Sequence, residues 1–481
     1  MKKIAVIISL LINVWNTTYA QQYTPRIEPC PCMIKVDPAL LTQCGYLVVP
    51  ENRAQPNGRI VKVPFVFTRP KGYDANRNVM LISVGGPGYS TIDNFDTIPK
   101  EAGFFQYGAF LAFDQCGTSR SIPRLDCPEV EEAVRQSYRQ QLSRDSLVAI
   151  AVTQCRNKYR KQGIDISAYN TIENAADIND LRKALKIDSL NLMGMSYSAG
   201  LMLTVARNHP QGIRCLILNS PLPGFVNYEE HASFNLEEAL QQVFDNCTKD
   251  SATLPQYDNL QQRFRHYFTA VTGKEFHIRY AEKTKQNSLD IIYTKAELLK
   301  AIISRLNNKQ IASAPSVINE IINGNHNAYV KEVLDATFAG DKRMSLGMRY
   351  SVYCAEQMLW TDQALMEKQT TVLPWLTGYV DNNVDQQICD CWKVNKGPAA
   401  AKTPVYSNIP TLIASGDADP WCRPFYAKTI KRYMPNAQAI IIHNTAHTPP
   451  LRVNGTDFLK TFLEHPYRKL PADVKDVIVE R

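Results

Sequence analysis

One serine of this chain stands where a nucleophile would be expected. Residues 194–200 read Gly-Met-Ser-Tyr-Ser-Ala-Gly, after a strand-like apolar run (190–193) and before a run of helical spacing (201–208). A serine on a sharp turn from strand to helix is lifted clear of the sheet, with the helix N-terminus beneath it. Serine in a turn is commonplace, so this context is what makes Ser196 the predicted nucleophile. The small Ser198 suits the tight turn, although glycine is usual at its position.

A serine nucleophile needs a base and an acid that orients the base, and both residue types follow later apolar runs. Residues 415–420 read Ser-Gly-Asp-Ala-Asp-Pro, and residues 443–448 read His-Asn-Thr-Ala-His-Thr. The chain order serine, acid, histidine is a known one, and sites in parallel sheets gather at the carboxyl ends of strands. His447, in the loop, can reach a nucleophile better than His443, which ends the strand run. The residues alone leave Asp417 and Asp419 open as the acid.

Acyl transfer also needs N–H donors aimed at the oxyanion that develops during the reaction. Residues 84–88 read Val-Gly-Gly-Pro-Gly at the end of another apolar run, so Gly85 or Gly86 can supply one donor. Tyr197, which follows the nucleophile, supplies the other. A plain turn remains an alternative. A phosphate-binding loop is disfavoured because neither Gly-Lys-Ser/Thr nor Gly-x-Gly-x-x-Gly spacing follows.

The elements that must position these residues alternate along the chain. Short apolar runs bounded by Gly, Pro or charge predict strands at 62–68, 79–84, 109–114, 190–193, 215–218, 411–414 and 437–442. Residues 171–187 follow a helical period, with apolar positions broadly on one face. Strand and helix alternating in this way predict an α/β fold with a mainly parallel sheet covered on both faces.

The middle of the chain differs from both ends. From about residue 228 to 369 glycine is scarce, strand-like runs are few and apolar residues recur at helical spacing, as in 296–306 and 330–338. We therefore expect a sheet domain formed by 21–224 and 405–481, and a mostly helical insertion at 225–404, called the cap below. A cover over the site is its natural role, since insertions on a rigid scaffold carry specificity. An independent helical domain is the alternative, but no linker isolates the segment.

The N-terminus has the pattern of a cleaved secretory signal. Two lysines precede an apolar stretch at 4–14, and a polar tail ends Thr-Tyr-Ala at residue 20. The apolar stretch is far shorter than the ~20 residues that span a bilayer. We expect cleavage after Ala20 and export to a periplasm or the medium. No later segment is long and apolar enough to span a membrane.

The twelve cysteines all follow the predicted signal, which suits an oxidising compartment. Cys127 and Cys155 flank a helical excursion and could close it. The couples Cys30/Cys32 and Cys389/Cys391 are each too close to pair easily within themselves. Cys-x-Cys pairs without histidines at ligand spacing do not predict a zinc site. The formal net charge of +8 is spread out, without the Lys/Arg run that would predict a nucleic-acid partner.

The chain resembles the prolyl aminopeptidase and tripeptidyl aminopeptidase branch of the α/β-hydrolase family, whose members have a C-terminal segment of tripeptidyl-aminopeptidase type. The resemblance covers most of the chain, from Cys-Gly-Tyr-Leu-Val-Val-Pro at 44–50 to the histidine loop. Residues 84–88 are similar to the family's His-Gly-Gly-Pro-Gly, with Val replacing His. Residues 114–121, Asp-Gln-Cys-Gly-Thr-Ser-Arg-Ser, resemble Asp-Gln-Arg-Gly-x-Gly-x-Ser, with Cys116 replacing the arginine and Ser119 the second glycine. Residues 176–178 and 181–182, before the serine turn, are also typical.

The resemblance implies roles for particular residues. The family's Gly-x-Ser-Tyr-Gly-Gly aligns Ser196 as the nucleophile, its Gly-x-x-Asp-Pro aligns Asp419 as the acid, and its terminal histidine aligns with His447. A stretch of the cap, Tyr-Cys-Ala-Glu-Gln at 353–357, resembles the family's Cys-x-Glu/Asp segment. That implies Glu356 as the anion that holds the ammonium group of a substrate, although a solvated surface glutamate is an equal alternative.

These observations lead to one expected function and two alternatives. The chain is expected to be an exported serine exopeptidase that releases one or a few residues from peptides with a free N-terminus. It would need no metal or organic cofactor. A carboxylesterase or lipase using the same residues is the main alternative, because a fold does not fix a substrate. A catalytically inactive binding protein is disfavoured, since nucleophile, acid, base and glycine-rich loop occur in the right order. The sequence does not indicate an oligomeric state.

Overall fold

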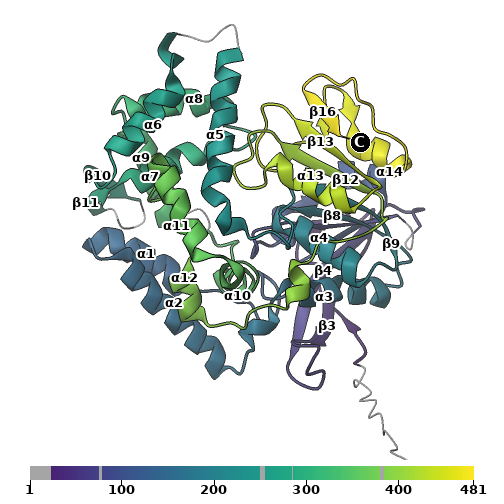
Figure 1. Cartoon of the computed structure of the whole chain (residues 1–481). Coiled ribbons are helices and arrows are strands. Elements are labelled where there is room, and N and C mark those ends of the chain that lie inside the picture. The colour runs from purple at the N-terminus through teal and green to yellow at the C-terminus, as the bar shows by residue number, and fades with distance from the viewer. Residues whose placement is uncertain are drawn as a thin grey trace, which may run out of the picture.

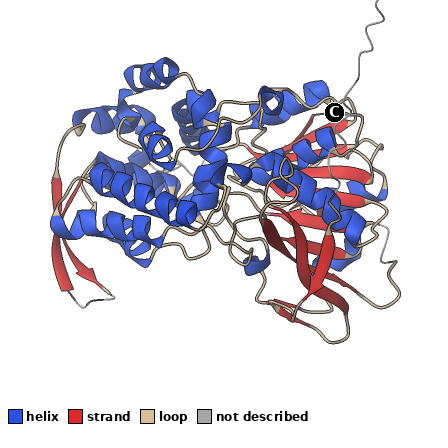
Figure 2. Ribbon diagram, turned by 90° about the horizontal axis from the view of Figure 1, so that it is seen from below, coloured by secondary structure: helices blue, strands red, loops and turns tan. Residues whose placement is uncertain are grey.

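The computed structural model describes residues 23–74, 78–249, 255–283, 285, 287–379 and 384–480 (Figure 1). The expected signal peptide at 1–20 lies outside these residues. The described part contains no helix long and apolar enough to cross a membrane. Figure 2 shows a domain built around a large sheet beside a mostly helical region.

A ten-stranded sheet forms the centre of the first domain. Its strands, in spatial order, are β1 (Arg26–Pro29), β3 (Leu41–Pro50), β4 (Ile60–Arg69), β7 (Phe110–Phe113), β5 (Val79–Ser83), β8 (Leu190–Met195), β9 (Ile213–Asn219), β12 (Thr411–Gly416), β13 (Ala437–Ile442) and β16 (Val477–Glu480). The strands from β7 to β13 pair in parallel. Those outside them pair antiparallel. The prediction of a mainly parallel central sheet is confirmed.

Helices cover both faces of this sheet because its central strands are apolar on both sides. Alternate residues of a strand point to opposite faces. Ile413 of β12 packs in the cluster that contains α3 (Thr171–Ala184), α4 (Tyr197–Asn208) and α13 (Pro424–Tyr433). Its neighbour Leu412 packs in a second cluster with α14 (Phe458–Glu464). Both strands that precede the acid and histidine loops, β12 and β13, are buried along their whole length.

The cap divides into two parts with different packing. The first has its own apolar core and comprises α5 (Ala232–Lys249), α6 (Leu260–Ala270), the hairpin β10 (Phe276–Glu282) and β11 (Asn287–Tyr293), α7 (Lys295–Ile303), α8 (Ala314–Ile322) and α9 (Asn327–Ala339). The second comprises α10 (Leu346–Glu356), α11 (Gln363–Val372) and α12 (Gln386–Trp392). Buried residues of α10 and α12, such as Tyr350 and Trp392, belong to the core cluster of the sheet domain. The cap is therefore joined to that domain through a shared core.

A helical hairpin from the first half of the chain lies beside the cap. It consists of α1 (Pro128–Gln140) and α2 (Arg144–Lys161), and Figure 1 shows α2 next to α12. Arg139 of α1 forms a 2.6 Å ion pair with Glu282 of β10, and the Tyr138 hydroxyl donates to Glu297 of α7 at 2.8 Å. The part of the chain before residue 225 thus contributes a helical hairpin that packs on the cap, in addition to the first strands of the sheet.

Disulfides tie three of these regions. Cys127–Cys155 closes the α1–α2 hairpin, as its position in the sequence suggested. Cys32–Cys44 fixes the N-terminal segment to β3, and Cys354–Cys389 joins α10 to α12. In each Cys-x-Cys couple, one cysteine pairs with a partner outside the couple, which leaves Cys30 and Cys391 outside these bridges.

Candidate active site

Ser196 occupies the turn between β8 and α4 in a strained backbone conformation. Its φ of 57° and ψ of −126° lie where L-residues rarely go, at a cost of order 1–3 kcal/mol. Backbone bonds hold the turn: the Ser196 N–H donates to the Asn219 carbonyl at 3.0 Å, and its own carbonyl accepts from Ala199 N–H at 3.0 Å. A side chain at Gly194 would collide with the backbone of Ser198. The need for a small residue at 194 therefore comes from this close approach.

Asp419 and His447 form a hydrogen-bonded pair at the carboxyl ends of β12 and β13. His447 Nδ1 lies 2.8 Å from Asp419 Oδ2. The other oxygen, Oδ1, accepts the backbone N–H groups of Trp421 and Cys422, both at 2.9 Å. Burial would raise the pKa of this fully buried carboxyl, but His447 and the two N–H donors outweigh it and hold the pKa below its ordinary value. Asp419 is thus built to stay ionised beside the imidazole.

A second aspartate–histidine pair explains why two acids and two histidines occur here. His443 Nδ1 lies 2.7 Å from Asp417 Oδ2. The His443 side chain is 46% exposed, against 20% for His447, and only His447 lines the pocket that contains Ser196. The structure therefore pairs Asp419, rather than Asp417, with the histidine that lines the same pocket as the serine.

The glycine-rich loop lies against the serine turn. A Cβ placed on Gly85 would come within 2.7 Å of Ser196 Cβ and 3.0 Å of Tyr197 N, so only glycine fits this approach. Gly86 has a φ of 117°, which glycine adopts without strain. Gly85, Gly86 and Ser196 line the same pocket. The loop, the nucleophile and Tyr197 are thus brought together as an oxyanion hole requires.

Ser198, the unusual residue of the turn, links α4 to this loop. Its hydroxyl lies 3.1 Å from the Ser83 hydroxyl at the end of β5 and also donates to the Val84 carbonyl. The Gln115 amide donates to Ser198 Oγ at 2.9 Å and to Val84 O at 3.2 Å. A glycine at 198 would lack the three contacts that the Ser198 hydroxyl makes with Ser83, Val84 and Gln115. The serine therefore ties the start of α4 to the glycine-rich loop.

The rest of the Asp-Gln-Cys-Gly segment supports the loop. Asp114 is fully buried and accepts the N–H groups of Thr91 and Ile92 and the Ser90 hydroxyl. Burial raises the pKa of its carboxyl to about 6. Cys116 stands where the family has arginine. Its thiol is buried, and its backbone N–H donates to Asn174 Oδ1 at 2.9 Å.

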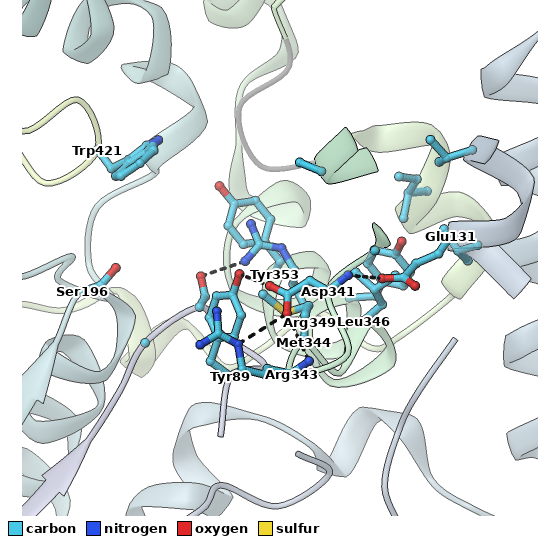
Figure 3. A pocket seen from close by; sticks show the side chains of 18 of the residues that line it. Tyr89, Glu131, Ser196, Asp341, Arg343, Met344, Leu346, Arg349, Tyr353 and Trp421 are labelled. Atoms are coloured by element: carbon cyan, nitrogen blue, oxygen red, sulfur yellow. Dashed lines mark hydrogen bonds and ion pairs between the residues drawn. The ribbon is translucent and has the colours of Figure 1, made fainter. Parts of the chain in front are cut away.

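The pocket has a volume of about 1140 Å³ and runs well beyond the serine. Aromatic and apolar residues line it together with Ser196, among them Leu222, Tyr228 and Trp421, and the α1–α2 hairpin contributes Val130, Val134 and Val148. Figure 3 shows Tyr89, Asp341, Arg343 and Arg349 gathered between Ser196 and Glu131 in this view. Four carboxylates line the pocket, namely Glu131, Asp145, Asp341 and Asp385.

Glu356 lies elsewhere. It is absent from the residues that line this pocket, and it is hydrogen-bonded at the N-terminus of α3. Its Oε1 accepts the Thr171 N–H at 2.7 Å and its Oε2 the Thr171 hydroxyl at 2.5 Å, and that hydroxyl lies 2.7 Å from Tyr197 Oη. Burial raises the pKa of Glu356 above its ordinary value. Its role as an ammonium anchor stays a prediction, and the structure does not bring it to Ser196 in the way that it brings His447.

Sequence reasoning did not single out several residues that form this site. Trp421 packs edge-on against the His447 ring with centroids 5.1 Å apart, and a signal was present, since it follows the Asp-Pro pair directly. Arg349 and the valines of α1 and α2 carried no such signal. They reach the pocket only because α10 and the hairpin fold over the sheet.

Only one group in the described residues has the donor spacing of a metal site. The side-chain donor atoms of Asp419, Cys422 and His447 lie within 4.8 Å of one another. Asp419 and His447 bind each other, so this group is explained by the acid–histidine pair with a neighbouring thiol. The expectation that no metal is needed stays a prediction.

Comparison with known proteins places the chain among enzymes of one fold. Residues 85–451 match a family model described as alpha/beta hydrolase fold. Serine protease Hip1 of Mycobacterium tuberculosis is 26% identical over 243 residues, which are 47% of this chain and 45% of that protein. Tripeptidyl aminopeptidase of Streptomyces lividans is 24% identical over 188 residues, 37% of this chain and 35% of that protein. The chain is thus aligned with less than half the length of either relative.

Proposed function

The chain belongs to the α/β-hydrolase family, and from this premise we propose that it is an exported serine exopeptidase with Ser196, His447 and Asp419 as its catalytic triad. The observation that carries the proposal is the meeting of a strained serine and a buried aspartate–histidine pair in one pocket. The similarity to two relatives named as a serine protease and a tripeptidyl aminopeptidase supports a peptide as substrate.

The proposed mechanism assigns one step to each group. His447 takes the proton of the Ser196 hydroxyl as the oxygen attacks the substrate carbonyl, and Asp419 orients the imidazole and stabilises its charged form. N–H groups of Gly85 or Gly86 and of Tyr197 stabilise the tetrahedral oxyanion. His447 then gives the proton to the leaving amine, and water hydrolyses the acyl-enzyme. No metal or cofactor takes part.

The pocket suits a substrate of more than one residue on the acyl side of the cut bond. Its volume exceeds the ~300–1000 Å³ of pockets for single small ligands. The ammonium group of a free N-terminus needs an anion beside it. The candidates are Glu356, from the family resemblance, and the carboxylates that line the pocket. Of the latter, Asp341 and Glu131 are held in place, because Asp341 accepts the Tyr89 hydroxyl at 2.8 Å and Glu131 accepts the Asp341 N–H at 2.9 Å.

We also propose that the protein acts outside the cytoplasm after cleavage behind Ala20. The lysine-led apolar N-terminus and the three disulfides among the described residues support export. Mass spectrometry of the protein recovered from its natural compartment tests this. A mature chain that begins at Gln21 is expected.

Three matched substrates test the activity. They are a short peptidyl chromogenic amide with a free N-terminus, its N-acetylated twin, and a short-chain aryl ester. An exopeptidase of the proposed type cleaves the first and loses activity on acetylation. Cleavage of the ester alone would instead indicate a carboxylesterase with the same triad.

Variants of the same protein assign the residues. Ser196→Ala is expected to abolish turnover of every substrate while its circular dichroism and melting temperature stay at wild-type values. Glu356→Gln, Asp341→Asn and Glu131→Gln, compared on the free and acetylated amides, identify the ammonium anchor as the variant that loses only the preference for the free amine. Retained turnover by Ser196→Ala would refute the proposed nucleophile.

A further inference from the structure

The groups proposed for catalysis lie on loops of the sheet domain, and two of these loops are held by side chains of the cap. The histidine loop (443–448) follows β13, and the oxyanion loop (84–89) follows β5. Asn308 of the cap contacts the first and Arg349 the second. Both contacts join segments far apart in the sequence, so they form only when the cap is folded onto the sheet domain.

Asn308 holds the backbone on both sides of the catalytic histidine. It lies between α7 and the 3₁₀ turn at Ile311–Ser313, and its Oδ1 accepts the Ala446 N–H at 2.8 Å. Its Nδ2 donates to the carbonyls of His447 at 2.8 Å and Thr448 at 2.9 Å. One carboxamide thus serves three consecutive residues of the loop, and these bonds restrain the Cα position from which the His447 ring projects.

The histidine loop has a reason to need this support. Thr448 has a φ of 53°, an unusual conformation for a β-branched residue, and its N–H donates to Ser220 Oγ at 2.8 Å. A residue in that region costs of order 1–3 kcal/mol and persists only when its surroundings hold it. Asn308 of the cap and Ser220 of the sheet domain both hydrogen-bond to this strained segment and hold it from opposite domains.

Arg349 holds the oxyanion loop in a comparable way. Its side chain is buried, its Nη1 donates to the Gly86 carbonyl at 2.8 Å, and it lies 3.5 Å from the Pro87 carbonyl. The neighbouring Ser345 N–H donates to the Gly88 carbonyl at 3.0 Å. A charged donor fixes the orientation of the Gly86 carbonyl, and with it the peptide planes of the loop that carries the proposed oxyanion donors.

We propose that Asn308 and Arg349 are positioning residues, and that the cap completes the active site instead of merely covering it. The proposal rests on the triad proposed above, and it holds for ester and amide substrates alike. A misplacement of about 1 Å can cost about a hundredfold in rate. Loss of the bonds made by Asn308 or by Arg349 should therefore lower kcat on both kinds of substrate by a similar factor and leave KM nearly unchanged.

Asn308→Asp and Arg349→Met test the two positioning residues in the full-length mature protein. Aspartate keeps the acceptor for Ala446 but turns the donor towards His447 and Thr448 into a repelling oxygen. Kinetics on the aryl ester and the free-amine amide are measured together with the rate at which a fluorophosphonate labels Ser196. We expect kcat and the labelling rate to fall about tenfold to a hundredfold, with the melting temperature within a few degrees of the wild type.

Matched variants separate positioning from a general loss of stability. Lys309→Ala changes the exposed neighbour of Asn308, and Arg305→Met removes a buried arginine of the cap whose ion pair with Glu332 stays within the cap. Both are expected to keep wild-type kcat. Arg349→Lys, which keeps a charged donor, should recover part of the loss seen in Arg349→Met. Asn308→Ala, which only removes the bonds, replaces the aspartate variant if that variant does not fold.

The outcomes are distinguishable. Labelling of Ser196 at the wild-type rate in folded Asn308 and Arg349 variants would overturn the positioning role, as would an activity loss that merely follows the unfolded fraction. If the wild-type protein itself is not labelled, or Ser196→Ala is labelled equally, the triad fails and the inference falls with it.

Discussion

Two aspartate–histidine pairs lie in the same two loops, with their aspartates two residues apart and their histidines four, and they have nearly the same bond length in different surroundings. The inner pair, Asp419–His447, and the outer pair, Asp417–His443, have N···O distances of 2.8 and 2.7 Å. The inner aspartate is fully buried and its histidine faces the pocket, whereas almost half of the outer histidine's side chain is exposed. An Asp–His hydrogen bond is therefore not what marks a catalytic pair here. We propose that complete burial of the acid and a histidine that lines the same pocket as Ser196 mark it instead.

The two histidines give the largest expected difference. His447→Gln should lower kcat by about 10⁶, because loss of the base in a serine triad costs about that much. His443→Gln should stay within about twofold of the wild type, as surface changes usually do. Steady-state kinetics on the aryl ester measure both. Similar losses in the two variants would mean that the pairs are not distinguished as we propose.

The two acids give the next effect. Asp419→Asn should lower kcat by about 10⁴, since the amide no longer holds the imidazole in the productive tautomer. Asp417→Asn should change kcat little. It weakens only the outer pair and a 3.3 Å bond from the Thr445 N–H. A larger loss in Asp417→Asn than in Asp419→Asn would reverse the assignment of the acid.

The inner pair has an aromatic neighbour that the outer pair lacks among the ring contacts of the described residues. Trp421 meets the His447 ring edge-on, and contacts of this kind contribute about 0.5–1.5 kcal/mol. Trp421→Ala should therefore lower kcat by up to about tenfold, and Trp421→Phe should restore most of it. Full activity in the alanine variant would show that the imidazole needs no packing partner.

The same contrast explains which parts of the site could be predicted from sequence. Ser196, His447 and the strands before them carry local signals: an apolar run, a tight turn and a polar residue at a strand end. The choice between Asp417 and Asp419 needed the family resemblance, because both follow the same strand. The places of Asn308 and Arg349 in the site and the packing of the α1–α2 hairpin on the cap could not be predicted, since these contacts join segments 138 to 263 residues apart and depend on how the cap packs. Glu356 shows the same limit, because its bonds to Thr171 of α3 are contacts between distant segments.

Burial that hydrogen bonds do not outweigh, in contrast to the inner pair, is found at Asp114, which supports the oxyanion loop. Its Oδ1 accepts the N–H groups of Thr91 and Ile92, yet no cation faces it among its described partners, and burial raises the pKa of the carboxyl to about 6. The folded protein therefore binds a proton more tightly than the unfolded chain between about pH 4 and 6. Because the folded state holds the extra proton, stability falls as the pH rises through that window.

Asp114→Asn removes this charge with little change of shape. The asparagine oxygen can accept both N–H groups, and its amide can donate to the Ser90 hydroxyl, which turns to accept. We expect turnover close to the wild type, a free energy of unfolding at pH 7 higher by up to about 3 kcal/mol, and a flatter dependence on pH between 4 and 6. Urea unfolding across that pH range measures the free energy of unfolding. Burial also raises the pKa of Asp177 to about 6, so part of the pH dependence of stability is expected to remain in both proteins. A variant less stable at pH 7 than the wild type would mean that the ionised carboxylate, through its bonds to the loop, outweighs the cost of its burial.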